Sequence, residues 1–135
     1  MAEPLTPYPP AGADLLISAE AIQAALERIA AAITADLGDR NPVVITVMTG
    51  GLVFAGQLLP RLPFPLECDY VHVRRYGRGT QGGELQWLAG PHAELSGRSV
   101  LLLDDILDEG QTLAAVRKAL LERGAREVRI AALTR

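Results

Sequence analysis

The segment VLLLDDILDEGQT, residues 100–112, joins an apolar run to a cluster of acidic side chains. Asp104 and Asp105 follow four aliphatic residues directly, and Asp108 and Glu109 come shortly afterwards. Carboxylates are costly to bury, and they repel one another when they are crowded. A cation or a strongly polarised ligand would relieve that repulsion, so the segment predicts a ligand site.

The residues around this cluster predict what the ligand is. The apolar run is typical of a buried strand, and ligands of parallel α/β sheets bind at the carboxyl ends of the strands. Gly110 permits a tight turn before a helix that should begin near Thr112, where free N–H groups can bind an anion. Carboxylates beside a phosphate need a bridging cation such as Mg²⁺, or sugar hydroxyls that donate to them. The segment therefore predicts a ribose phosphate site with magnesium nearby. By itself the pattern also fits a strand end with solvated acids and a capped helix.

The rest of the chain alternates strands with helices, which predicts an α/β fold with a mostly parallel, buried sheet flanked by helices. Ser18 is the expected N-cap of the first helix, and its apolar residues recur at helical spacing. The glycine-rich segment 77–83 should form a mobile arm between two strands. The expected helices cover residues 19–38, 52–59 and 112–125, and the expected strands cover residues 42–48, 68–76, 84–90, 100–103 and 127–133.

Length and composition exclude several classes of protein. The 135 residues suit one domain, divided into a flexible Pro-rich lead-in (1–15) and a core (16–135). With a net charge of −3 and no basic stripe, the chain is not expected to bind nucleic acid, and no apolar run is long enough to span a membrane. The single cysteine, Cys68, fits a reducing cytoplasm and is expected to be a buried small hydrophobe.

Other candidate motifs have weaker chemistry. Walker-type NTPases also place an acid after an apolar strand, but the nearest match to their phosphate loop, GLVFAGQL, lacks the lysine and the hydroxyl. We therefore reject that interpretation. His72 and His92 have no metal-ligating partners at a usable spacing, so we expect both to be structural or surface residues. Tyr70 and Trp87 are expected to pack rather than to stack on a base.

The segment VLLLDDILDEGQTL resembles the phosphoribosyl pyrophosphate motif of type I phosphoribosyltransferases, and more narrowly that of the hypoxanthine–guanine phosphoribosyltransferases. VVITVMTGGLVFAGQL is similar to the first strand, pyrophosphate loop and helix of that family, and DYVHVRRYGRGTQGGELQW to its next strand and flexible catalytic loop. The resemblance covers nearly the whole chain after the N-terminal tail, in the family's order. It implies a Rossmann-like core with a flexible hairpin arm.

The resemblance also implies an activity. Such an enzyme of purine salvage transfers the 5-phosphoribosyl group from phosphoribosyl pyrophosphate to hypoxanthine or guanine, giving IMP or GMP and pyrophosphate. It would use Mg²⁺, work in the cytoplasm and form a homo-oligomer, a dimer or a tetramer. Two alternatives stay open: a non-catalytic domain that senses phosphoribosyl pyrophosphate, and a transferase for another base, such as orotate or adenine.

Within the acidic segment, the resemblance assigns a role to each residue. Asp104 and Asp105 match the acid pair that contacts the ribose hydroxyls and helps to place magnesium. Asp108 matches the acid in the ribose phosphate site near purine N7, which is the proposed catalytic general base or acid. The loop that wraps the 5′-phosphate matches Glu109, Gly110, Gln111 and Thr112. Many members have threonine in place of Glu109, so its side chain should point away from the phosphate.

Two further segments match the pyrophosphate site. Thr49 and Gly50 match the loop that binds pyrophosphate, in which the family often has a cis peptide. Arg75 and Tyr76 match the pair in the flexible loop that closes over the pyrophosphate, although the family usually has serine where Arg75 stands. The TGG turn and the Arg-Tyr pair would be weak signals by themselves, and they gain weight from their order around the acidic motif.

One part of the family pattern has no counterpart in the sequence. A lysine that reads the purine oxygen, an aromatic residue that stacks on the base and a further metal-binding aspartate follow the segment that matches VRIAALTR. We therefore expect a core that is incomplete at its C-terminus, a longer natural protein, and no useful turnover of hypoxanthine or guanine by these 135 residues alone. The base preference is left undetermined.

Overall fold

The computed structural model describes residues 18–75, 85–106 and 110–134. The predicted lead-in (1–15) and the glycine-rich arm (77–83) lie outside the described residues. Along the chain the elements are α1 (Ala19–Leu37), β1 (Val43–Met48), α2 (Leu52–Leu58), the 3₁₀ turn η1 (Leu59–Arg61), β2 (Glu67–Arg75), β3 (Leu85–Ala89), β4 (Ser99–Ile106), α3 (Gly110–Glu122) and β5 (Glu127–Thr134).

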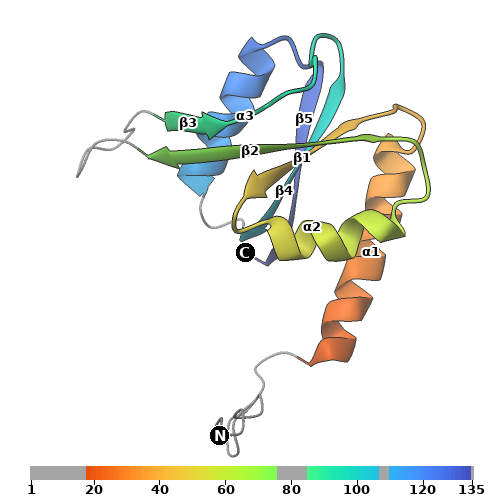
Figure 1. Ribbon diagram of the computed structural model, residues 1–135. Coiled ribbons are helices and arrows are strands. Elements are labelled where there is room, and N and C mark those ends of the chain that lie inside the picture. Colours follow the sequence, from red (N-terminus) through yellow and green to blue (C-terminus); the bar gives the residue numbers. More distant parts are fainter. Residues whose placement is uncertain (1–17, 76–84, 107–109, 135) are drawn as a thin grey trace, which may run out of the picture.

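The strands form one five-stranded sheet in the order β3-β2-β1-β4-β5. β1 pairs in parallel with β2 and β4, and β4 pairs in parallel with β5. β3 is the antiparallel exception and returns along β2. This arrangement confirms the prediction of a mostly parallel α/β sheet, and Figure 1 shows the helices on its two faces.

Each face of the sheet has its own apolar core. Alternate strand residues point to opposite faces, so the run in β1 is buried on both sides. On one face, α3 packs its Leu113, Val116 and Leu120 against the sheet. On the other face, α1 and α2 cover the sheet, with Leu26 and Phe54 fully buried. The continuous apolar strands are therefore explained by two helical layers.

The first helix follows its sequence pattern closely. The hydroxyl of Ser18 accepts a hydrogen bond from the N–H of Ala21, as an N-cap does, and Gly38 ends the helix. Leu26 and Ile33 are buried, and Ile22 and Ile29 pack against the same cluster. None of the helices in the described parts of the chain has the length and apolar character needed to cross a membrane.

Two elements near the acidic segment differ from their predicted bounds. β4 continues past the apolar run as far as Ile106, because β5 pairs with it up to Thr134 and satisfies its backbone. Asp104 and Asp105 are therefore residues of β4, near its carboxyl end, and do not follow the strand. α3 begins at Gly110, two residues before the expected Thr112.

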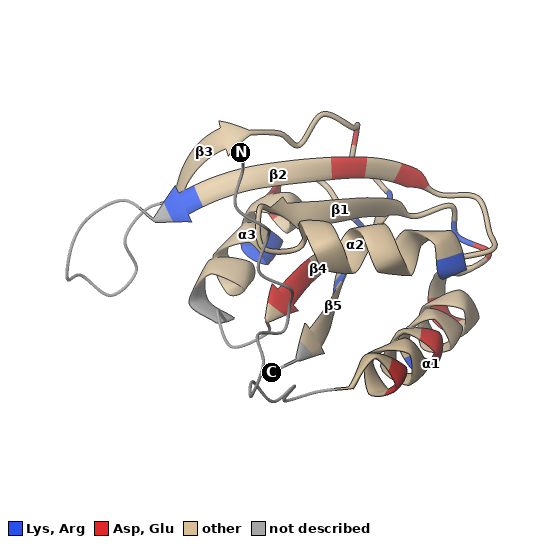
Figure 2. Cartoon of the chain, turned by 60° about the horizontal axis from the view of Figure 1, so that its bottom comes forward, with Lys and Arg blue, Asp and Glu red and all other residues tan. Residues whose placement is uncertain are grey.

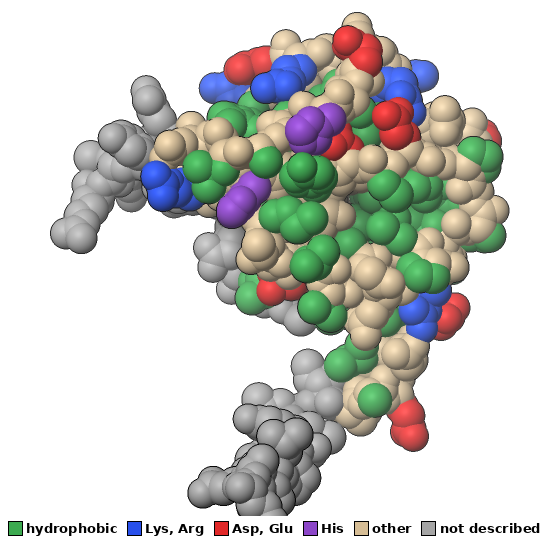
Figure 3. Space-filling model, in the orientation of Figure 1, with side chains coloured by type: hydrophobic (Ala, Val, Ile, Leu, Met, Phe, Trp, Pro, Cys, Tyr) green, Lys and Arg blue, Asp and Glu red, His purple; other side chains and the backbone are tan. Residues whose placement is uncertain are grey.

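The prediction that Cys68 is buried is wrong: its side chain is exposed. α1 and α2 cover β1 and β4, but the part of β2 that carries Cys68 and Tyr70 on this face extends beyond them. Tyr70 is also exposed there, with its ring centroid 5.0 Å from that of His92. Figure 3 shows hydrophobic side chains gathered on the surface over β2 and α2. Strand character alone did not reveal which face the helices leave open.

Candidate active site

The carboxyl ends of β1, β2 and β4 meet at one edge of the sheet, because these strands are parallel and adjacent. Acidic residues colour the end of β4 and a basic residue colours the end of β2 at this edge (Figure 2). In parallel sheets such an edge is the usual place for a ligand. The sequence pattern and the topology thus indicate the same location.

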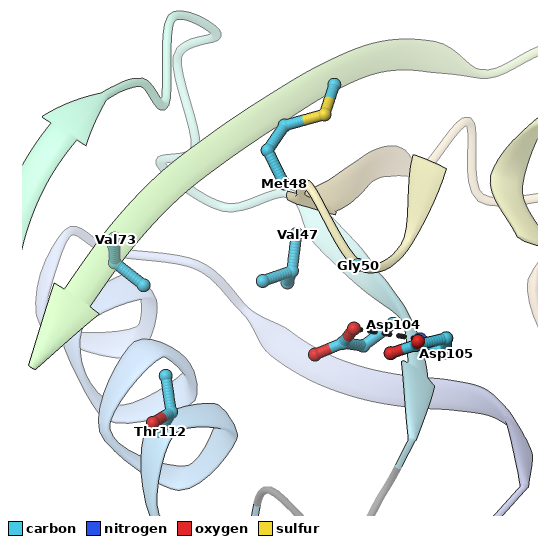
Figure 4. A pocket seen from close by; sticks show the side chains of 7 residues that line it. All are labelled: Val47, Met48, Gly50, Val73, Asp104, Asp105 and Thr112. Atoms are coloured by element: carbon cyan, nitrogen blue, oxygen red, sulfur yellow. Dashed lines mark hydrogen bonds between the residues drawn. The ribbon is translucent and has the colours of Figure 1, made fainter. Parts of the chain in front are cut away.

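A pocket of about 220 Å³ lies at this edge. Val47 and Met48 come from β1, Gly50 from the following turn, and Val73 from β2. β4 supplies the acid pair and α3 supplies a hydroxyl. The complete lining consists of Val47, Met48, Gly50, Val73, Asp104, Asp105 and Thr112. Figure 4 shows Val47, Val73, Asp104 and Thr112 around a common space.

The two carboxylates of the acid pair lie close together at the end of β4. Both side chains line the pocket, and Figure 4 draws their carboxylate groups side by side near the turn at Gly50. Asp104 is only 8% exposed, and Asp105 is half-buried. The N–H of Asp105 donates to Oδ1 of Asp104 over 2.8 Å. The end of β4 therefore presents two carboxylates whose oxygens can bind a ligand.

The turn after β1 lies against this strand end. The Met48–Thr49 peptide bond is cis, a feature that the family resemblance led us to expect in this loop. Thr49 and Gly50 are exposed, and the N–H of Gly51 donates to the carbonyl of Val47 over 2.9 Å. A Cβ atom on Gly50 would lie 3.0 Å from Oδ1 of Asp105 and 3.3 Å from Oδ1 of Asp104. The turn is thus in close contact with the acid pair.

The structure brings together only part of the residue set predicted from sequence. Asp104, Asp105, Gly50 and Thr112 all line the pocket. Thr49 adjoins Gly50 in the turn. Gly110 and Gln111 form the start of α3, and Arg75 is the last residue of β2 at the same edge of the sheet. Tyr76, Asp108 and Glu109 lie outside the described residues.

Four lining or supporting residues were not singled out from the sequence. Val47, Met48 and Val73 form the apolar wall, and the buried Gly51 joins the turn to the strands. The alternation in β2, which places Val73 on the inner face, was a usable signal for one of them. Gly51 is the second glycine of the TGG turn, and its role depends on contacts that no sequence pattern displays.

Neither histidine is among the residues that line this pocket, although His72 pairs in register with Met48, which does line it. In the described part of the chain, no group of three or more His, Cys, Asp or Glu side chains could hold a metal ion. The backbone N–H groups of His92 and Ala93 donate to Asp69, which ties the connection before β4 to the start of β2. Trp87 packs against the apolar core, with the guanidinium of Arg123 5.5 Å from its ring centroid.

The chain matches the phosphoribosyl transferase domain family over residues 15–135, and it belongs to that family. Its five-stranded core has the type I phosphoribosyltransferase fold, which confirms the resemblance seen in the sequence. Among solved structures, a hypoxanthine phosphoribosyltransferase from Staphylococcus aureus has a TM-score of 0.82 and 27% identity, covering 88% of this chain and 65% of that chain. A hypoxanthine-guanine phosphoribosyltransferase from Bacillus anthracis has a TM-score of 0.82 and 26% identity, covering 89% of this chain and 72% of that chain.

Two curated proteins are also similar to this chain. The hypoxanthine-guanine phosphoribosyltransferase of Bacillus subtilis is 32% identical over 120 residues, which are 88% of this chain and 67% of that protein. The bifunctional protein TilS/HprT of Listeria innocua is 34% identical over 120 residues, again 88% of this chain but 18% of that protein. The chain thus spans about two thirds of the length of the first relative and less than a fifth of the second.

Proposed function

We propose that this protein is a purine salvage enzyme that transfers the 5-phosphoribosyl group from phosphoribosyl pyrophosphate to hypoxanthine or guanine. The products would be IMP or GMP and pyrophosphate. The observation that best supports the proposal is the contact between the turn at Gly50 and the acid pair at the carboxyl edge of a parallel sheet. The name of the Bacillus subtilis relative, which is 32% identical, describes this activity.

The reaction changes the charge of the groups on both sides of ribose C1, and the protein has to stabilise these charges. A purine nitrogen forms a bond to C1 while the bond from C1 to the pyrophosphate oxygen breaks, and pyrophosphate leaves with that electron pair. Asp104 and Asp105 would accept hydrogen bonds from the ribose hydroxyls and favour a cationic ribosyl transition state. Asp108 would take or give the purine proton near N7.

Two loops would hold the anionic groups of the substrate. The 5′-phosphate would bind the N–H groups at the start of α3, a position that suits an anion because helix N-termini carry free donors. Glu109, Gly110, Gln111 and Thr112 form this loop in the proposal. Thr49 and Gly50 would contact the pyrophosphate, with Arg75 and Tyr76 closing over it and excluding water that would hydrolyse the activated sugar.

Magnesium fits the donor set of this pocket. Asp104 and Asp105 supply two carboxylates, and Mg²⁺ is usually bound by one or two carboxylates together with substrate phosphates. When bound, the ion would neutralise charge on the pyrophosphate leaving group. The acid pair would hold the ion and at the same time position the ribose.

Two properties of the whole protein follow from family membership as further proposals. We expect a homo-oligomer, either a dimer or a tetramer, which light scattering on the purified protein would measure directly. We also expect a cytoplasmic location, since the sequence has a single cysteine and suits a reducing compartment. Fractionation of cells with an antibody to the protein would test the location.

The test of the proposed activity is an assay for pyrophosphate release with four bases. The product of the complete gene should turn over hypoxanthine or guanine in the presence of phosphoribosyl pyrophosphate and Mg²⁺, and it should turn over adenine and orotate far more slowly. Turnover of adenine or orotate instead would show a transferase for another base. Tight binding of phosphoribosyl pyrophosphate with no turnover of any base by the product of the complete gene would favour the regulatory alternative.

A further inference from the structure

Backbone conformation does not explain why positions 50 and 51 are glycines. Among the described residues, the glycines with positive φ are Gly90, Gly97 and Gly124, and the φ of Gly51 is −81°. Neither Gly50 nor Gly51 therefore lies in the left-handed backbone region that favours glycine. The remaining reason for a glycine is close approach of other atoms.

The contacts of the two glycines are of different kinds. A Cβ on the buried Gly51 would lie 2.6 Å from the carbonyl oxygen of Leu103 and 2.9 Å from that of Val47. These are backbone atoms of β4 and β1, so they cannot yield, and Gly51 fixes the turn against both strands. A Cβ on Gly50 would instead meet the carboxylate oxygens of Asp105 and Asp104 at 3.0 and 3.3 Å.

We propose that Gly50 is a positioning residue for the acid pair: its bare Cα leaves the space in which both carboxylates take their ligand-binding orientation. Oδ1 of Asp104 and Oδ1 of Asp105 both lie beside the position that a Cβ on Gly50 would take, and Figure 4 draws the two carboxylates together below the turn that carries Gly50. Because Gly51 holds the turn in place, a methyl group at position 50 would displace the carboxylates rather than the turn. This inference rests on the proposed function, since it assigns those carboxylates to ribose and magnesium.

A set of glycine-to-alanine variants separates this role from general effects on α2 and its turn. Gly56 lies exposed in α2, and a Cβ there would meet no atom within 4 Å, so Gly56→Ala is the matched control. We expect Gly50→Ala to remain folded, because flexible side-chain ends can rotate away. Its affinity for phosphoribosyl pyrophosphate with Mg²⁺ should fall by about tenfold or more, the loss of one charge-assisted hydrogen bond.

The other two variants have distinct expected results. Gly51→Ala should lower Tm by several degrees, because its Cβ would overlap backbone oxygens that cannot move. Gly56→Ala should keep the affinity of the wild type and its Tm or a slightly higher one, because alanine favours a helix more than glycine does. Calorimetric titration and thermal unfolding measure both quantities on the same preparations.

A double variant tests the contact itself without any ligand. Asp105→Ala removes the atom nearest to the added methyl, so any loss of Tm caused by Gly50→Ala should be smaller in the Asp105→Ala background. If Gly50→Ala alone fails to fold, the double variant should fold. Failure of both to fold would contradict the proposal, because the methyl would then clash with something other than the carboxylate.

Different results would contradict the proposed function and the positioning role of Gly50. If the wild type does not bind phosphoribosyl pyrophosphate with Mg²⁺, the proposed function is wrong. If the wild type binds and Gly50→Ala binds equally well, the proposed function stands and the positioning role of Gly50 is wrong. An equal loss of affinity in Gly56→Ala would also overturn the inference, because the loss could not then come from the acid pair.

Discussion

The N–H of Asp105 donates a hydrogen bond to Oδ1 of Asp104, its neighbour in β4, over 2.8 Å. Asp104 is 8% exposed, so this donor helps to hold a carboxylate that water scarcely reaches. A buried carboxylate without donors would be costly. The backbone of the strand end therefore fixes one member of the acid pair, while the other stays half-buried at the pocket.

Substitution of Asp104 should separate its charge from its hydrogen bond. Asp104→Asn can keep an oxygen acceptor for the N–H of Asp105 but loses the charge, so we expect a small change in stability and at least about a tenfold loss of affinity for phosphoribosyl pyrophosphate with Mg²⁺. Asp104→Ala should in addition lower the free energy of unfolding by about 1–3 kcal/mol, because it leaves a donor unpaired.

The control for this pair is Asp39→Asn, at an exposed position between α1 and β1 at the other edge of the sheet. Denaturation by urea and calorimetric titration give the two quantities. Affinity in Asp104→Asn equal to that of the wild type would remove Asp104 from the ligand site.

Substitution of Asp108 should affect chemistry rather than binding. If its carboxylate manages the purine proton, Asp108→Asn should lower kcat by roughly 10²-fold, the usual scale of acid–base catalysis, in an active preparation of the protein. The Kd for phosphoribosyl pyrophosphate should change little. An unchanged kcat, where the chemical step limits the rate, would exclude this role.

Glu127 makes the stability of the fold depend on pH at the edge opposite the pocket. The Ser99 hydroxyl and the Arg40 guanidinium each donate a hydrogen bond of 2.6 Å to the Glu127 carboxylate. These two bonds, with the larger effect from Ser99, hold the pKa of the Glu127 carboxyl below its ordinary value of 4.5. A pKa that is lower in the folded state stabilises the fold above the unfolded pKa, and this gain is lost as pH falls through the folded pKa.

Glu127→Gln should therefore lower Tm at pH 7, and its difference from the wild type should shrink as pH falls below about 4.5. Glu122→Gln, at an exposed position at the end of α3, is the matched control and should show no such trend. Thermal unfolding across this pH range is the measurement. A difference that stays constant with pH would contradict the assignment.

Asp69 should hold the connection between β3 and β4. Its Oδ2 accepts the N–H groups of His92 and Ala93, each at 2.8 Å. Asp69→Ala should lower the free energy of unfolding by about 1–3 kcal/mol, because it removes both charge-assisted bonds, and Asp69→Asn should cost less. Hydrogen exchange should speed up at the amides of His92 and Ala93. Unchanged exchange at these two amides would show that Asp69 does not hold this segment.

The sequence predicted the strands and helices well because these elements depend on apolar periodicity and on helix caps formed by residues close in the chain. Ser18 caps α1 as expected, and the apolar runs of β1 and β4 are buried between two helical layers. Cys68 was misplaced because exposure depends on which helix covers which strand, and that is a tertiary relationship. The placement of Asp104 and Asp105 inside β4 follows from the extension of this strand, which depends on its pairing with β5.

The acidic motif predicted the pocket, but its geometry required the fold. The close approach of Gly50 to the acid pair joins residues that are more than fifty positions apart in the sequence. Nothing local to the TGG turn distinguishes it from an ordinary turn. The roles of Asp108, Glu109 and Tyr76 stay predictions from the family resemblance.

The central claim is that the acid pair and the adjacent turn bind phosphoribosyl pyrophosphate through magnesium. Titration of phosphoribosyl pyrophosphate into the 135-residue chain by calorimetry, once with Mg²⁺ and once with a chelator, tests it most directly. Two carboxylates beside a pyrophosphate repel it unless a cation lies between them, so the affinity should be at least about tenfold higher with Mg²⁺. Equal affinity under both conditions would contradict the account.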